Sequence, residues 1–198
     1  MHQYYIVYKP FQVLSQFTTT EGKRSLKDFF PVPKDCYPVG RLDFDSEGLL
    51  VLTNDPAIND RLLHPRFAHH REYWVQVEGV ITPAAIRQLE TGVTITVDGK
   101  PWRTHPAVVK VFEPPPVVPD RNPPIRYRAQ IPTTWISMVL GEGKNRQVRK
   151  MTAQTGFPTL RLIRYRIEKV ALDGLQPGEM REFARQELYS LLFAERNR

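Results

Sequence analysis

The sequence predicts an α+β protein with a mixed, mainly antiparallel central sheet flanked by helices. Two observations support this class: stretches rich in aromatic and β-branched residues outnumber helical stretches, and the two kinds alternate without a repeat of solenoid length. A chain of 198 residues has room for one ordinary domain with a hydrophobic core. We therefore expect a single domain over residues 1–198.

Strands are expected where apolar residues cluster or alternate with polar ones. In chain order these stretches cover residues 4–8, 13–17, 49–53, 72–78, 93–97, 108–112 and 132–140. The stretch 49–53 is the most apolar, which predicts a buried strand, whereas 72–78 alternates as a half-buried strand does.

Helices are expected where a capping residue precedes a suitable first turn. The capping pairs are, in chain order, Ser25 with Asp28, Asp55 with Pro56, and Thr82 with Pro83. Pro31 is expected to stop the first of these helices early, and Gly92 to end the third.

Prolines concentrate in one segment of the chain. Six of the 18 prolines lie between Glu113 and Pro124, three of them consecutive. Such a run is incompatible with a helix or a central strand. The strand pattern resumes at residue 132, so we expect a surface loop or insertion over residues 113–125 and not a linker between domains.

The charge and the cysteine content limit which partners and which cellular compartment the protein can have. Lys and Arg number 28 against 21 Asp and Glu, and the net charge of +7 favours an anionic partner such as nucleic acid or a membrane surface. The single cysteine, Cys36, cannot form an internal disulfide, which indicates a reducing compartment. The sequence has no apolar run near the ~18 residues of a membrane span and no signal-peptide pattern. We expect a soluble, cytoplasmic protein.

Residues 40–48 form a charged loop bounded by glycines, and a rigid scaffold often presents catalytic groups on such loops. Asp43, Asp45 and Glu47 resemble the start of a calcium-binding EF-hand loop. However, Asn54 stands where the twelfth position requires a bidentate glutamate. A glycosidase-type carboxylate pair is a weak alternative, because spacing on a loop fixes no distance. A plain polar turn remains open.

Residues 141–151 combine glycines with four basic side chains around an expected helix start. Backbone N–H groups, the helix dipole and the cations together suit phosphate oxygens, although the Walker spacing of an NTPase is absent. Val148, Met151 and Thr155 recur at helical spacing, which predicts a buried stripe with Arg146 and Lys150 facing outward. A solvated basic face without a ligand remains open.

Aromatic side chains lie near cations at several places, and such surfaces can stack on unpaired bases. The aromatic residues with a nearby arginine are Tyr73, Trp74, Trp102, Tyr127 and Tyr165. Each of them alone is more often a core residue. A zinc site is disfavoured, because no paired ligand spacing occurs among its candidates His64, His69, His70 and Cys36.

Three motifs together resemble the RNA pseudouridine synthases of the branch that contains the small-subunit ribosomal enzyme A. They are, in chain order, residues 40–55, reading GRLDFDSEGLLVLTND, residues 71–75, reading REYWV, and residues 143–151, reading GKNRQVRKM. Two further stretches, within residues 121–135 and at 156–165, are similar to family members that act on large-subunit ribosomal RNA. The resemblance runs from about residue 4 to residue 181.

The resemblance implies a pseudouridine synthase catalytic fold and an enzyme that isomerises a specific uridine of 23S ribosomal RNA. The family breaks the N-glycosidic bond and rejoins the uracil through carbon, without a metal or cofactor. Asp43 would be the catalytic aspartate, Tyr73 the active-site tyrosine and Arg149 the basic partner of the aspartate. Many relatives carry an S4-type RNA-binding domain before the core, whereas here the core strand begins near Tyr4, so none is expected.

Contacts with RNA are expected from basic and polar side chains in and beside the motifs: Arg41, Arg71, Lys144, Asn145, Arg146, Gln147, Lys150, Arg161 and Arg164. The expected partner is 23S ribosomal RNA before full ribosome assembly. The protein is expected to be a monomer and to have no membrane partner. A non-catalytic RNA-binding or ribosome-assembly factor is the alternative, since it needs the cations but not Asp43. A glycoside hydrolase acting on free sugars is a third possibility, and it predicts no steep salt dependence of binding.

Overall fold

The computed structural model describes residues 1–125 and 130–193, so Tyr127 and its neighbouring arginines lie outside the described residues. The chain divides into two compact units, Met1–His69 with Arg164–Arg198, and His70–Ile163. It passes from the second unit back to the first within strand β11 (Thr159–Ile167). The expectation of one domain over the whole chain stays a prediction.

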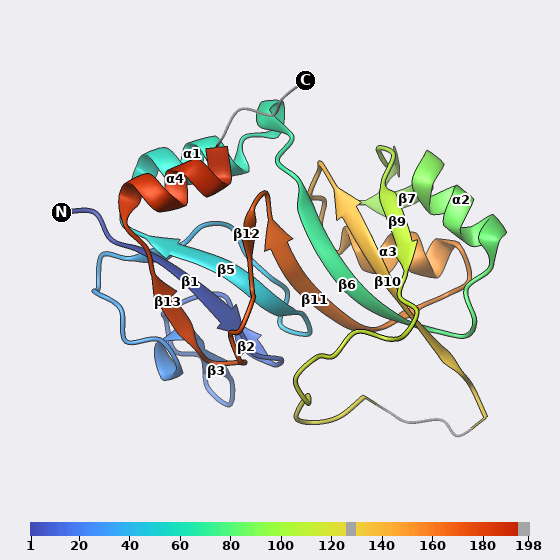
Figure 1. Cartoon of the computed structure of the whole chain (residues 1–198), viewed down its shortest axis with the longest axis horizontal. Coiled ribbons are helices and arrows are strands. Elements are labelled where there is room, and N and C mark those ends of the chain that lie inside the picture. The colour runs from blue at the N-terminus through green and yellow to red at the C-terminus, as the bar shows by residue number, and fades with distance from the viewer. Residues whose placement is uncertain (126–129, 194–198) are drawn as a thin grey trace. The chain divides into compact units, whose positions relative to one another are not determined.

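The first unit is built on antiparallel strands (Figure 1). Its other strands are β1 (Tyr4–Lys9), β2 (Val13–Leu14), β3 (Arg24–Ser25), β4 (Tyr37–Pro38), β5 (Glu47–Thr53), β12 (Val170–Ala171) and β13 (Met180–Glu182). β1 lies between β13 and β5, β4 pairs with β5, and β12 pairs with β11, all antiparallel. β2 and β3 form a small parallel pair, so the strand directions are mixed.

The core of the first unit lies on β1 and β5, in which every residue is buried. One cluster comprises Tyr5, Val7, Val13, Leu26, Phe30, Cys36, Leu50 and Leu52. The helical elements are η1 (Leu26–Asp28), α1 (Pro56–Leu63), η2 (Pro65–Phe67) and α4 (Arg185–Phe193). Ser25 and Asp28 form the predicted capping box of η1, which is a single short 3₁₀ turn.

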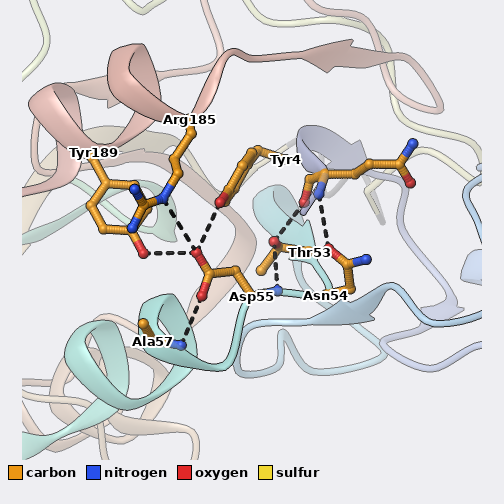
Figure 2. A network of polar contacts seen from close by, with 8 residues as sticks. Tyr4, Thr53, Asn54, Asp55, Ala57, Arg185 and Tyr189 are labelled. Carbon is orange, nitrogen blue, oxygen red and sulfur yellow. Dashed lines mark hydrogen bonds and ion pairs between the residues drawn. The ribbon is translucent and has the colours of Figure 1, made fainter. Parts of the chain in front are cut away.

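Asp55 joins three elements of the first unit (Figure 2). One carboxylate oxygen caps α1 by accepting from the backbone N–H of Ala57 at 3.0 Å. The other accepts from the hydroxyls of Tyr4, on β1, and Tyr189, on α4, at 2.9 and 2.8 Å. Burial and the hydrogen bond to Asp55 raise the pKa of Tyr4 to about 12. Asp55 thus caps one helix and holds α4 to β1.

In the second unit, β10 lies between β6 and β9 and is antiparallel to both. The elements of this unit are β6 (Arg71–Glu78), α2 (Pro83–Thr91), β7 (Thr94–Val97), β8 (Lys100–Arg103), β9 (Val108–Val111), β10 (Thr133–Leu140) and α3 (Gln147–Gln154). β7 and β8 form an antiparallel hairpin. Side chains of β6, β7, β9, β10 and both helices share one core, which includes Val75, Leu89, Ile95, Ile136 and Met151.

The predicted α+β class with mainly antiparallel strands is confirmed, but several elements were not predicted, the longest being strand β11 and helix α4. The strand expected over residues 13–17 ends at Leu14, where its partner β3 also ends. The short strand β8 was not predicted either, because Pro101 is unfavourable inside a strand. Residues 113–125, expected to form a surface loop or insertion, contain neither helix nor strand. Among the described residues, no helix has the length and apolarity needed to cross a membrane.

Candidate active site

Asp43 lies on a turn that backbone hydrogen bonds stabilise, one within the turn and one from a neighbouring turn. The backbone N–H of Ser46 donates to the carbonyl of Asp43 at 3.0 Å, which closes the turn. The N–H of Gln12, in the connection between β1 and β2, donates to the carbonyl of Phe44 at 2.8 Å. Asp43 itself is half-buried. The carboxylate is therefore carried by backbone that is bonded on both sides of it.

Ser15 anchors the residue immediately before Asp43. Its hydroxyl donates to the carbonyl of Leu42 at 2.7 Å and accepts from the N–H of the same residue at 3.0 Å. Leu42 is buried, so both of its backbone polar groups need partners inside the protein. One serine satisfies both.

Gly48 lets β5 approach β11 closely after the turn. Its φ is +116°, and a Cβ at this position would lie 2.4 Å from the carbonyl oxygen of Arg164. The Nε of Arg164 donates to the carbonyl of Leu49 at 2.8 Å, and the Arg164 side chain is buried. A glycine is therefore required where the candidate loop joins the buried strand.

Lys9 places a buried amine close to the candidate loop. It is the last residue of β1, pairs with Gly48 and has no exposed surface. Its Nζ donates to the carbonyls of Pro10 and Val13 at 2.9 and 2.7 Å. Burial lowers the pKa of Lys9 to about 7, although the charges of the three loop carboxylates oppose this change. Lys9 thus braces the turn that contacts the loop.

Tyr73 and Arg149 belong to the second unit. Tyr73 lies on β6 opposite Met138 of β10 and packs against the core of that unit, half-buried. Arg149 lies in the first turn of α3 and is also half-buried. The predicted buried stripe of this helix is confirmed by Val148 and Met151. The pairing of Arg149 with Asp43 and the role of Tyr73 stay predictions.

The nine residues expected to contact RNA fall into groups of different exposure. Arg41, Asn145 and Arg146 are exposed, and Arg71, Lys144 and Lys150 are half-buried. Gln147, Arg161 and Arg164 are buried.

All three buried members of this set bond within the protein. The Arg161 guanidinium donates to the carbonyl of Pro119 at 2.8 Å and so holds the proline-rich loop. Gln147 bonds to the loop that precedes α3, and Arg164 bonds to the backbone of β5. The structure thus gives these three side chains supporting contacts.

Three of the aromatic side chains considered for base stacking, Trp74, Trp102 and Tyr165, have partners inside their units. The indole N–H of Trp74 donates to Glu72 at 3.0 Å, and that of Trp102 donates to Glu142 at 3.2 Å. The Tyr165 hydroxyl bonds to Asp173. Among the described residues, no group of three or more His, Cys, Asp or Glu side chains is arranged to hold a metal ion.

Sequence reasoning missed Lys9, Ser15 and Glu142 as parts of the site. The Lys9-Pro10 pair only indicated the end of a strand, and Ser15 lay inside a predicted strand. Glu142 stands between two glycines, and this position was the one signal that the residue holds a tight loop. Their importance depends on partners distant in the sequence.

Comparison with known proteins identifies the family. The family described as RNA pseudouridylate synthase matches residues 3–154. The ribosomal large subunit pseudouridine synthase E of Vibrio vulnificus (strain CMCP6) is 50% identical over 176 residues, which cover 89% of this chain and 73% of that protein. The protein of the same name from Xanthomonas axonopodis pv. citri (strain 306) is 47% identical, over 85% of this chain and 87% of the relative.

A solved structure supports the fold. The crystal structure of a pseudouridylate synthase superposes with a TM-score of 0.76 at 24% identity, over 96% of this chain and 74% of the other. This likeness confirms the predicted fold. The family match covers well over half of the chain and agrees with the three motifs. The chain therefore belongs to the RNA pseudouridylate synthase family.

Proposed function

We propose that this chain converts a specific uridine of 23S ribosomal RNA to pseudouridine, with Asp43 as the catalytic carboxylate. The relatives named for the large ribosomal subunit support the class of RNA. The observation that carries the residue assignment is the rigid presentation of Asp43, whose turn is bonded to the β1–β2 connection and to Ser15. We further assign the chain to the branch of the small-subunit ribosomal enzyme A on its motif residues.

The chemistry needs a carboxylate that remains ionised beside the ribose of the target uridine. Asp43 would then either attack C1′ or remove a proton from the ribose as the N-glycosidic bond breaks, and the uracil leaves with the electron pair of that bond. The uracil turns and its C5 bonds to C1′ as the bond to Asp43 breaks or as Asp43 returns the ribose proton. The proton on C5 is then lost to a base while N1 takes up a proton. Arg149 would keep the carboxylate charged through a charge-assisted contact. Tyr73 would stack on the base and assist proton transfer at the new bond. In this proposal the two compact units act as one catalytic domain.

The exposed and half-buried cations are the proposed RNA contacts, because phosphate oxygens are reached from the surface. Arg41 lies beside Asp43, and Lys144, Arg146 and Lys150 lie around the start of α3. Contact with these side chains would offset the cost of taking the uridine out of a helix, a few kcal/mol if it is paired. We propose that the protein acts as a monomer in the cytoplasm on RNA that is not yet assembled into ribosomes.

An Asp43→Asn variant tests the assignment, because it keeps the size of the side chain and removes its charge. We expect pseudouridine formation on protein-free 23S ribosomal RNA to fall by at least about 10³-fold. The matched control is Asp45→Asn, which removes a carboxylate two residues away in the same turn and should leave activity near that of the wild type. Chemical labelling of pseudouridine followed by primer extension measures both. Activity retained in Asp43→Asn would contradict the assignment.

RNA affinity separates this proposal from a non-catalytic RNA-binding factor. We expect Asp43→Asn to bind the same RNA with affinity close to that of the wild type, and binding to weaken steeply with salt in both proteins. A wild-type protein that binds RNA but forms no pseudouridine would favour the binding factor. Binding without salt dependence would contradict an RNA ligand.

A further inference from the structure

Glu142 joins three segments of the second unit through one carboxylate. Its Oε1 accepts from the backbone N–H of His105 at 2.8 Å and from Nε2 of Gln147 at 2.6 Å. Its Oε2 accepts from Nε1 of Trp102 at 3.2 Å. The donors come from β8, from the connection after β8 and from the start of α3. The loop Gly141–Arg146 is therefore tied to the hairpin β7–β8 as well as to its own helix.

Gln147 extends this bonding to the backbone of the loop. Its side chain is 4% exposed, its Nε2 bonds to Glu142, and its Oε1 accepts from the backbone N–H of Lys144 at 2.8 Å. The backbone N–H of Gln147 donates to the carbonyl of Lys144 at 3.1 Å. The Nζ of Lys144 in turn lies 3.9 Å from the centroid of the Trp102 ring. Backbone and side chain of Lys144 are thus both placed by residues that bond to Glu142.

Arg146 shows why this loop needs such support. Its φ is +53° and its ψ is 31°, the left-handed region, which a residue with a side chain adopts at a cost. Residues in such conformations persist only where the surrounding contacts enforce them. Arg146 caps α3, so its conformation sets how the helix begins and where Arg149 stands on the first turn.

We propose that Glu142 is a positioning residue for the RNA-facing loop Gly141–Arg146 and, through Gln147, for Arg149. This inference rests on the proposed function. A carboxylate suits the task because it presents two acceptor oxygens and no donor, and its bonds to N–H groups are charge-assisted. A glutamine would offer one acceptor oxygen, and its NH₂ group would face the N–H of Trp102.

The test compares Glu142→Gln, Trp102→Phe and the double variant. Trp102→Phe removes the indole N–H and keeps an aromatic ring for Lys144. Each variant is assayed for pseudouridine formation on protein-free 23S ribosomal RNA, at a temperature at which circular dichroism shows it folded. We expect Glu142→Gln to lower kcat/KM between about 10-fold and 100-fold, the size of effect that small misplacements produce. Trp102→Phe alone should cause a smaller loss.

Rescue in the double variant distinguishes positioning from a general loss of stability. Once the indole N–H is absent, the glutamine NH₂ no longer opposes a donor, so we expect the double variant to recover most of the activity lost in Glu142→Gln. Wild-type kcat and KM in Glu142→Gln would overturn the inference, and so would a loss that Trp102→Phe does not reduce.

The affinity for the same RNA, measured by fluorescence anisotropy, separates this inference from the proposed function. We expect Glu142→Gln to bind about 10-fold more weakly than the wild type, with recovery in the double variant. A wild-type protein that forms no pseudouridine contradicts the proposed function, and the inference is then decided by these affinities. In that case, unchanged affinity in all three variants would overturn the inference. If the wild type is active, unchanged affinity together with unchanged kcat would overturn it.

Discussion

The loop that carries Asp43 and the loop that carries Lys144 and Arg146 are both tight and polar, but different contacts hold them. The first is held by backbone hydrogen bonds, by the neutral hydroxyl of Ser15 and by the buried amine of Lys9 nearby. The second is held by the carboxylate of Glu142.

The difference follows the sign of charge on each loop. A loop with three carboxylates would be destabilised by a fourth negative group, so partners without negative charge support it. A loop rich in cations gains from a carboxylate anchor, which accepts hydrogen bonds and also attracts the loop's charge. Each candidate RNA-facing loop is thus supported by groups of neutral or opposite charge.

The largest expected effect is a loss of stability when Gly48, at the end of the Asp43 loop, is replaced by alanine. Gly143, in the other loop, is expected to tolerate the same change. In Gly48→Ala the new Cβ would lie 2.4 Å from the carbonyl oxygen and 2.6 Å from the nitrogen of Arg164, both backbone atoms, at a φ of +116°. We expect the free energy of unfolding to fall by more than about 4 kcal/mol, or the protein not to fold. Soluble yield and urea-unfolding midpoints measure this.

Gly143→Ala is the matched control. A Cβ on Gly143 meets no heavy atom within 4 Å. We expect the stability to change by less than about 0.5 kcal/mol. If both variants unfolded at the same urea concentration, the close approach of β5 to Arg164 would not restrict Gly48.

A second prediction concerns the pH dependence of stability that Lys9 causes. Its pKa is lowered from 10.5 to about 7 by burial, so between these values the unfolded chain holds a proton that the folded chain does not. The penalty for the buried charge is full below pH 7 and decreases as pH rises toward 10.5. From pH 7 to 9.5 the wild type should gain up to about 1.4 kcal/mol per pH unit relative to Lys9→Met.

Urea-unfolding free energies of the two proteins, measured over that pH range, test the effect of Lys9. The tyrosines and other titrating groups are common to both proteins, so their contributions cancel in the difference. A difference between wild type and Lys9→Met that stays constant with pH would contradict a lowered pKa for Lys9.

The smallest expected effect concerns Ser15. Ser15→Ala removes the hydroxyl that satisfies both backbone groups of Leu42, so we expect a loss of about 1–2 kcal/mol in stability and reduced pseudouridine formation. Ser190→Ala is the control, since the exposed Ser190 hydroxyl only donates to a carbonyl within α4. If both variants lost the same small amount and kept full activity, Ser15 would not position the Asp43 loop.

Local rules predicted much of the fold. The helix caps at Asp55 and Thr82 and the end of α2 at Gly92 are confirmed, because capping depends on residues only a few positions apart. The apolar stretch 49–53 is buried as predicted. The three motifs are also local, and their residues are sufficient to indicate the family.

Tertiary structure decided which partners those residues meet. Asp55 is predicted as a cap from its neighbours, yet its bonds to Tyr4 and Tyr189 join residues 51 and 134 positions away. Arg161 and Arg164 are buried and donate to backbone carbonyls, partners that no local pattern indicates.

The sequence by itself determined the fold class, the family and the candidate Asp43, because pattern, caps and motifs are local. Only the tertiary structure decided that Lys9, Ser15 and Glu142 support the two loops. Their roles come from hydrogen bonds and burial that form when separate segments pack together, and no spacing along the chain encodes those contacts.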